Sequence, residues 1–195
     1  LLDYSILPEQ DLIVLNELNT IPPGLSQALD NYLSDNGTVV CIPGSAVVPE
    51  SYSTFFTRLR LGEFVGVNEA EHKITTINYD HPLFSGVFEK QVQNFQYPTS
   101  RLSYSINAPL ASPVLLFDNN RPFLSSLSTA SGNFYWVSGP MNKEYSNFTQ
   151  FSLIVPIFYN MAQLSTATKK IYYNIDNQSV VSLRASLGNV DVIRV

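Results

Sequence analysis

The sequence predicts an α/β fold with a mostly parallel sheet, and three observations lead to that class. Residues 11–18 (DLIVLNEL) and 38–42 (TVVCI) are short apolar runs rich in branched residues, which is typical of strands buried on both faces. Between them, apolar residues recur at helical spacing. Strand, helix and strand form a βαβ unit, which requires a right-handed crossover and a parallel sheet.

Two helices are expected to cover this sheet. The first follows the turn Pro22-Pro23-Gly24 and ends at Asn36-Gly37, because glycine tolerates the left-handed conformation after a helix. Its apolar face consists of Leu25, Ala28, Leu29, Tyr32 and Leu33. The second helix spans 49–61, and its inward face consists of Tyr52, Phe55, Phe56 and Leu59. A further strand is expected at 72–77.

The pattern changes in the C-terminal part of the chain. Residues 112–141 hold three strand-like runs separated by breaks at Asn119-Asn120 and Ser131-Gly132, which are too short for helices and so predict antiparallel neighbours. Residues 147–164 return to helical period, with Pro156 expected to bend the helix. We therefore expect an α/β domain over 1–164 and a small β element over 165–195.

Composition excludes several classes of function. The chain has 195 residues, a formal net charge of −5 and no run of Lys or Arg, so nucleic acid is not an expected partner. One cysteine excludes an internal disulfide framework and a multi-thiolate metal site. No apolar stretch is long enough for a membrane span. Because the chain starts at Leu1 without Met and stops in a strand-like pattern, we expect it to be a soluble piece of a longer protein.

The single thiol, Cys41, decides whether an enzyme should be expected. A nucleophile of this fold class sits on a sharp turn between small residues, whereas Cys41 lies between Val40 and Ile42, which favour an extended strand. We therefore predict a core cysteine and no catalytic residue. A hydrolase or amidase using Cys41 or Ser45 is the alternative. Against it, Asp80 and His81 are adjacent in one loop, where the carboxylate is poorly placed to orient the imidazole as a catalytic base.

A polar groove is the candidate ligand site. Loops at the carboxyl ends of parallel strands form the usual crevice of such sheets, and the loops after the first two strands should face the same edge. The groove candidates are Asn16, Glu17, Asn19, Ser45 and Tyr52. A single glycine, Gly44, is a weak phosphate-loop signal, so a turn is the better interpretation of 43–50. With only His72 and His81 as histidines, we expect neither a metal nor a cofactor.

Aromatic residues gather in the antiparallel part. Alternation along strands should bury about half of them, and exposed ones could supply an interface, because aromatic side chains carry much interface energy. They are Tyr97, Tyr104, Phe134, Tyr135, Trp136 and Tyr145. A carbohydrate-binding or sensing module stays open as a further alternative.

Four segments, taken in order, also carry a family resemblance. They are residues 11–44, DHPLF (80–84), VLLFDNNRPFLSS (114–126) and FYWVSGPMNKEYSNFTQFSLIVPIFYNMA (134–162). Together they resemble the class I glutamine amidotransferase-like domain of BatA-type membrane proteins of Bacteroidetes. The resemblance covers roughly residues 10 to 164, and 141–162 is its most specific part.

This resemblance implies a flavodoxin-like sheet that would lack its first strand and helix. It also implies a non-catalytic domain, because Cys41 lacks flanking glycines and no His-x-Glu follows the late strands as an amidotransferase triad would need. The implied location is periplasmic, on the extracytoplasmic side of the inner membrane, with membrane contact only through segments outside this chain. The implied partners are proteins, namely von Willebrand A-domain proteins and a MoxR-type ATPase.

Overall fold

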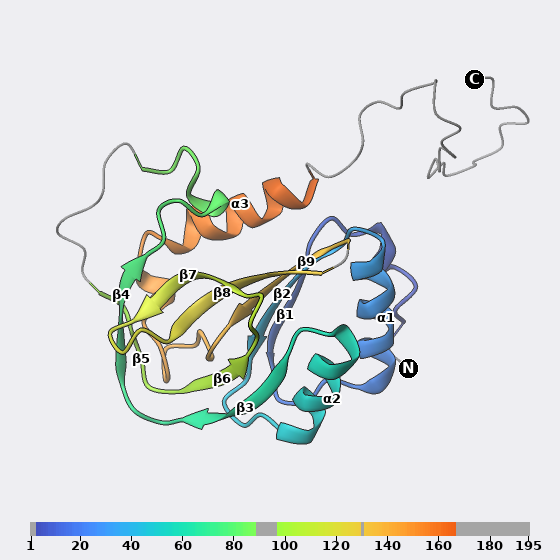
Figure 1. Cartoon of the computed structure of the whole chain (residues 1–195), viewed down its shortest axis with the longest axis horizontal. Coiled ribbons are helices and arrows are strands. Elements are labelled where there is room, and N and C mark those ends of the chain that lie inside the picture. Colours follow the sequence, from blue (N-terminus) through green and yellow to red (C-terminus); the bar gives the residue numbers. More distant parts are fainter. Residues whose placement is uncertain (1–2, 89–96, 130, 167–195) are drawn as a thin grey trace, which may run out of the picture.

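The computed structural model describes residues 3–88, 97–129 and 131–166 (Figure 1). Its first half contains η1 (Leu7–Glu9), β1 (Ile13–Leu18), α1 (Pro23–Ser34), β2 (Thr38–Pro43), α2 (Pro49–Leu59), β3 (Glu63–Asn68), β4 (His72–Ile77) and η2 (Pro82–Phe84). Its second half contains β5 (Thr99–Ser100), β6 (Ser103–Asn107), β7 (Ser112–Phe117), β8 (Pro122–Ser128), β9 (Asn133–Val137), η3 (Phe148–Gln150) and α3 (Ile154–Thr166). Residues 165 and 166 of the expected C-terminal β element (165–195) belong to α3. The rest of that element, from residue 167 onward, lies outside the described residues.

The main sheet is mixed rather than mostly parallel, so the expected flavodoxin-like sheet is wrong. Its seven strands run in the order β1-β2-β9-β8-β7-β4-β5. Only the neighbours β1-β2 and β2-β9 are parallel, and the other four pairs are antiparallel. The physical reason is connection length, since the short links from β7 to β8 and from β8 to β9 leave no room for crossover helices.

The N-terminal βαβ prediction is confirmed by the parallel pair β1-β2 and by α1 between them. Within α1, Leu29, Tyr32 and Leu33 are buried. All four inward-facing residues predicted for α2 are also buried. The left-handed residue after α1 is Asn36, with φ of +61°, and not Gly37. Gly37 is needed for space, because a Cβ there would overlap the ring and carbonyl oxygen of Tyr32.

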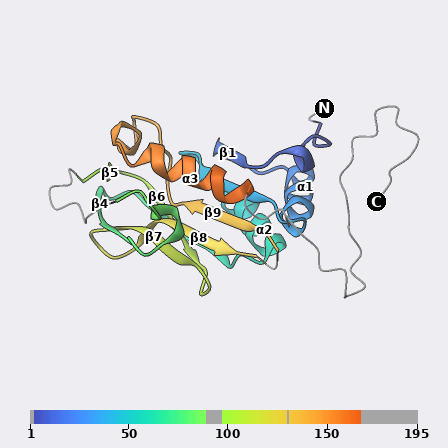
Figure 2. The ribbon, with the colours of Figure 1, turned by 90° about the horizontal axis from the view of Figure 1, so that it is seen from above.

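Two apolar cores lie on the two faces of the sheet (Figures 1 and 2). Alternation along β2 divides them, because Val39 and Cys41 pack with α1 and α2 while Val40 and Ile42 pack in the core that α3 covers. In β9, Trp136 belongs to the first core and Tyr135 to the second. β2 is therefore buried on both faces, as its continuous apolar run predicts. The same prediction is wrong for β1, because β1 is an edge strand of the sheet and Val14 and Asn16 on one of its faces are exposed.

The aromatic residues of the antiparallel part are mostly core. Tyr104, Phe134, Tyr135 and Trp136 are buried, and Tyr97 is exposed. The interface interpretation therefore does not apply to the four buried rings.

The C-terminal helix differs from its prediction in where it begins. Residues 148–150 form η3, and α3 starts only at Ile154. Pro156 thus lies in the first turn of α3, where its missing N–H has no helical acceptor to bond, and it does not sit inside a longer helix. Among the described residues, no helix combines the length and apolar character needed to cross a membrane.

A separate two-stranded antiparallel sheet, β3-β6, stands beside the main sheet. The inward side of β3 carries Phe64, whose ring lies 5.6 Å from that of Tyr52 and 5.8 Å from that of Tyr104. Neither strand was expected from the sequence. The strand that follows α2, β3, therefore belongs to this small sheet and not to the main sheet.

Candidate functional site

The residues predicted to line a groove lie around the ends of the parallel strands β1 and β2. Asn16, Asn19 and Ser45 are exposed at this edge, and Glu17 is half-buried. Tyr52 differs from the prediction, because it is fully buried beneath the edge and its hydroxyl donates to the carbonyl oxygen of Leu18 at 2.7 Å. The structure thus brings four of the five candidates to the edge and places the fifth in the core.

Glu17 holds this edge together through its carboxylate. Its Oε1 accepts from the backbone N–H groups of Met141 (2.8 Å) and Asn142 (2.7 Å), and its Oε2 accepts from Nδ2 of Asn142 at 2.8 Å. The backbone of Glu17 has a φ of +53°, at an irregularity in the β1-β2 register between Asn16 and Leu18. Such a conformation costs a non-glycine residue free energy, so the three hydrogen bonds must offset it. The carboxylate is therefore used to fasten the loop after β9.

The loop after β2 is fastened as well. Oδ1 of Asn19 accepts from the N–H of Ala46 at 3.1 Å, and the hydroxyl of Tyr104 donates to the carbonyl oxygen of Ser45 at 3.0 Å. Gly44 is required by this close approach, because a Cβ there would lie 2.8 Å from the carbonyl oxygen of Glu17 and nearer still to Oδ1 of Asn19. The turn interpretation of this loop fits that geometry.

Cys41 lies inside β2, fully buried, and not on an exposed turn. Burial raises the pKa of its thiol to about 12, an effect that a hydrogen bond with Tyr52 partly opposes. At neutral pH the sulfur is therefore protonated and out of contact with solvent. His81, the base considered for Ser45, uses its Nδ1 to accept the N–H of Leu83 at 3.2 Å, and burial lowers its pKa.

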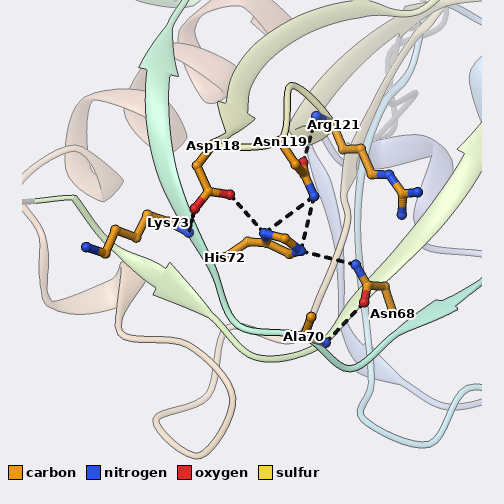
Figure 3. A network of polar contacts seen from close by, with 7 residues as sticks. All are labelled: Asn68, Ala70, His72, Lys73, Asp118, Asn119 and Arg121. Atoms are coloured by element: carbon orange, nitrogen blue, oxygen red, sulfur yellow. Dashed lines mark hydrogen bonds and ion pairs between the residues drawn. The ribbon is translucent and has the colours of Figure 1, made fainter.

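A second cluster of polar groups centres on His72, the first residue of β4 (Figure 3). Nδ1 of His72 lies 2.8 Å from Oδ1 of Asp118, in the turn between β7 and β8. Its Nε2 faces Nδ2 of Asn68 at 3.3 Å and Nδ2 of Asn119 at 3.1 Å. Three separate segments therefore meet at one imidazole.

The hydrogen-bond partners fix the tautomer of this imidazole. Oδ1 of Asn68 accepts from the N–H of Ala70, and Oδ1 of Asn119 accepts from the N–H of Arg121, so each amide presents its nitrogen to His72. An amide nitrogen can only donate, hence Nε2 of His72 accepts and Nδ1 carries the proton that it donates to Asp118. A general base requires this tautomer. However, the amide groups of Asn68 and Asn119 both donate hydrogen bonds to Nε2, the nitrogen that would accept a proton. The cluster fastens β3, β4 and the β7-β8 turn.

Replacing His72 by glutamine should raise the pKa of Asp118 toward its ordinary value of 3.8. The native pKa is lowered, chiefly because His72 hydrogen-bonds to the carboxylate. Asp118 therefore contributes stability that is complete above pH 3.8 and is lost as the pH falls through its lower folded pKa. An NMR titration of the side-chain carboxyl carbon measures the change. His81→Gln is the matched control, and an unchanged Asp118 titration in His72→Gln would contradict this assignment.

Sequence reasoning missed the pair of His72 and Asp118 because it depends on strand pairing across 46 positions. Antiparallel pairing of β4 with β7, with Ile74 opposite Phe117, puts the start of one strand beside the end of the other. The available signal was the position of Asp118, directly after a strand-like run. Among the described residues, no group of three His, Cys, Asp or Glu side chains could hold a metal ion.

No protein-family model and no curated protein sequence matches the chain. Solved structures share its fold at low identity. A cytoplasmic protein of Salmonella typhimurium, STM3548, is 14% identical with a TM-score of 0.64 over 83% of this chain and 74% of its own. The β-galactosidase from Rahnella sp. R3 is 13% identical with a TM-score of 0.57 over 80% of this chain. The N-terminal domain of mmIFT52 is 17% identical with a TM-score of 0.53 over 88% of this chain and 83% of its own.

These likenesses concern the fold alone. This chain corresponds to only 23% of the β-galactosidase, so the fold also occurs as a minor part of a large enzyme.

Proposed function

We propose that this domain acts by binding another protein, without catalysis, as an extracytoplasmic part of a membrane-anchored envelope protein. One observation carries the non-catalytic part, namely the burial of Cys41 in the middle of a strand. The groove candidates support it too, because the carboxylate of Glu17 and the side-chain amide oxygen of Asn19 already accept hydrogen bonds from backbone N–H groups of the chain itself. The envelope location is supported by the family resemblance of the segments.

Iodoacetamide should leave the native protein unmodified near neutral pH and modify Cys41 only after unfolding in urea. Burial raises the thiol pKa from 9.0 to about 12, so the thiolate fraction at a given pH falls about a thousandfold. Mass spectrometry of native and urea-unfolded samples measures the labelling. A Cys41→Val variant, labelled in parallel, reports modification at other residues. Rapid labelling of the native protein would favour the hydrolase alternative and overturn the proposal.

A further inference from the structure

The helix α3 lies along the outside of the molecule, across one face of the main sheet (Figures 1 and 2). Its inner side carries Ile157 and Met161, which are buried in the core that α3 covers. Nδ2 of Asn160 donates to the carbonyl oxygen of Leu83 at 2.7 Å, so the helix is also tied to η2. These contacts fix the rotation of α3 about its axis and determine which side chains point away from the core.

The outer side of α3 carries a regular series of exposed side chains. Val155 is 69% exposed and Tyr159 is 61% exposed, and Ala162 and Thr166 are exposed as well. These four residues, which we call the α3 seam, are separated by four, three and four positions. This spacing puts them on one line along a helix, and it is the spacing at which two helices pack side by side.

The α3 seam has no charged residue in it or beside it. α3 contains no Asp, Glu, Lys or Arg, and the sequence has none over residues 145–168. A helix on the surface of a protein ordinarily carries charged residues on its outer side, whereas a helix that is apolar on most sides is covered by protein. The exposed valine and tyrosine therefore indicate a contact surface for another helix.

A second copy of this chain fits the α3 seam by charge. Each copy has a formal net charge of −5, so copies repel one another in general, and they approach most easily through a face that is uncharged. Recognition of a different protein commonly uses complementary charges, which the α3 seam does not offer. The charge distribution therefore favours contact between copies over contact with another protein at this helix.

The order of side-chain sizes also fits a second copy. In a contact with two-fold symmetry, residue i of one copy contacts residue j of the other, and the reverse contact follows. If two α3 helices run antiparallel about an axis between Tyr159 and Ala162, the large Tyr159 lies against the small Ala162 of the other copy, and Val155 lies against its Thr166. Parallel helices would put tyrosine against tyrosine and alanine against alanine, which leaves space unfilled. The antiparallel arrangement therefore packs better.

We propose that two copies of this chain form a symmetric dimer in which their α3 helices pack antiparallel along the α3 seam. The dimer is additional to the binding of another protein proposed above and does not depend on it. A helix of 13 residues is about 20 Å long, which is short for an interface, so the dimer should be weak, with a Kd on the order of 100 μM.

Sedimentation equilibrium of the full chain tests this dimer, at concentrations from about 10 μM to about 1 mM. The native chain should pass from monomer to dimer over this range. Tyr159→Lys should weaken dimerisation by at least about tenfold, because each symmetric contact would then bury an unpaired ammonium group. The matched control, Val65→Lys, changes net charge equally at an exposed valine of β3 and should keep the native Kd.

A mixture of two variants tests the antiparallel alignment. Ala162→Glu alone should weaken dimerisation as Tyr159→Lys does. When the two variants are mixed, the introduced lysine of one copy faces the introduced glutamate of the other, and the second contact between Tyr159 and Ala162 is intact. The mixture should therefore dimerise about as tightly as the native chain, although neither variant does so alone.

A native chain that stays monomeric up to about 1 mM would overturn the proposal, and hydroxyl-radical footprinting of Tyr159 would then separate the other occupants. A protected Tyr159 in the monomer would assign the α3 seam to residues 167–195 of the same chain. An accessible Tyr159 would leave the α3 seam to a different protein. Equal weakening by Val65→Lys, or no recovery in the mixture of variants, would also contradict the dimer.

Discussion

Replacing Glu17 by alanine should lower the free energy of unfolding by about 3 kcal/mol. The substitution removes one carboxylate that accepts three hydrogen bonds from Met141 and Asn142, at 2.7–2.8 Å. Met141 is buried, so its N–H would lose its partner away from water. Since these bonds join the end of β1 to the loop after β9, 124 and 125 positions later, that loop should also loosen.

Glu17→Gln is the matched control for this effect. Its side-chain oxygen can still accept from both backbone N–H groups, but its amide would face Nδ2 of Asn142, whose own oxygen is held by the N–H of Glu144. We therefore expect a loss of about 1 kcal/mol, measured by urea unfolding. Both variants keep the left-handed backbone at position 17, so their difference reports the hydrogen bonds. Equal losses in the two variants would contradict this account.

The sequence predicted best what local periodicity controls. The faces of α1 and α2 and the doubly buried strand β2 follow from spacing and branched residues, and Val40, Cys41 and Ile42 are buried as expected. The core position of Cys41 needed only its two neighbours. These features depend on residues within one or two turns of each other, so no knowledge of strand pairing was required.

Strand pairing could not be predicted in the same way. The sheet joins β2 to β9 and places β4 beyond β7, and no local pattern specifies either neighbour. The strands β3 and β6 contain Gly66 and the polar residues Ser103 and Ser105, so they lack the apolar runs that predict buried strands. The same dependence on pairing hid the partners of Glu17 and of His72, because both sets lie far along the chain.

Replacing Gly132 by alanine should also lower the free energy of unfolding by about 3 kcal/mol. A Cβ at this position would lie 2.5 Å from the carbonyl oxygen of Leu33, nearer still to that of Gly37, and 3.1 Å from Cα of Leu33. All three are backbone atoms, which cannot rotate away as a flexible side chain can. The start of β9 would have to separate from the end of α1, where the N–H of Asn133 donates to the carbonyl oxygen of Gly37 at 3.0 Å.

Gly66→Ala is the matched control, because it adds the same methyl group to a strand where nothing lies within 4 Å. The φ of Gly66 lies outside the left-handed region, so alanine can adopt its conformation. We therefore expect Gly66→Ala to raise the free energy of unfolding by about 0.5 kcal/mol. Urea unfolding of both variants measures the difference. If Gly132→Ala were as stable as Gly66→Ala, the close packing of the start of β9 against the backbone of Leu33 and Gly37 would be wrong.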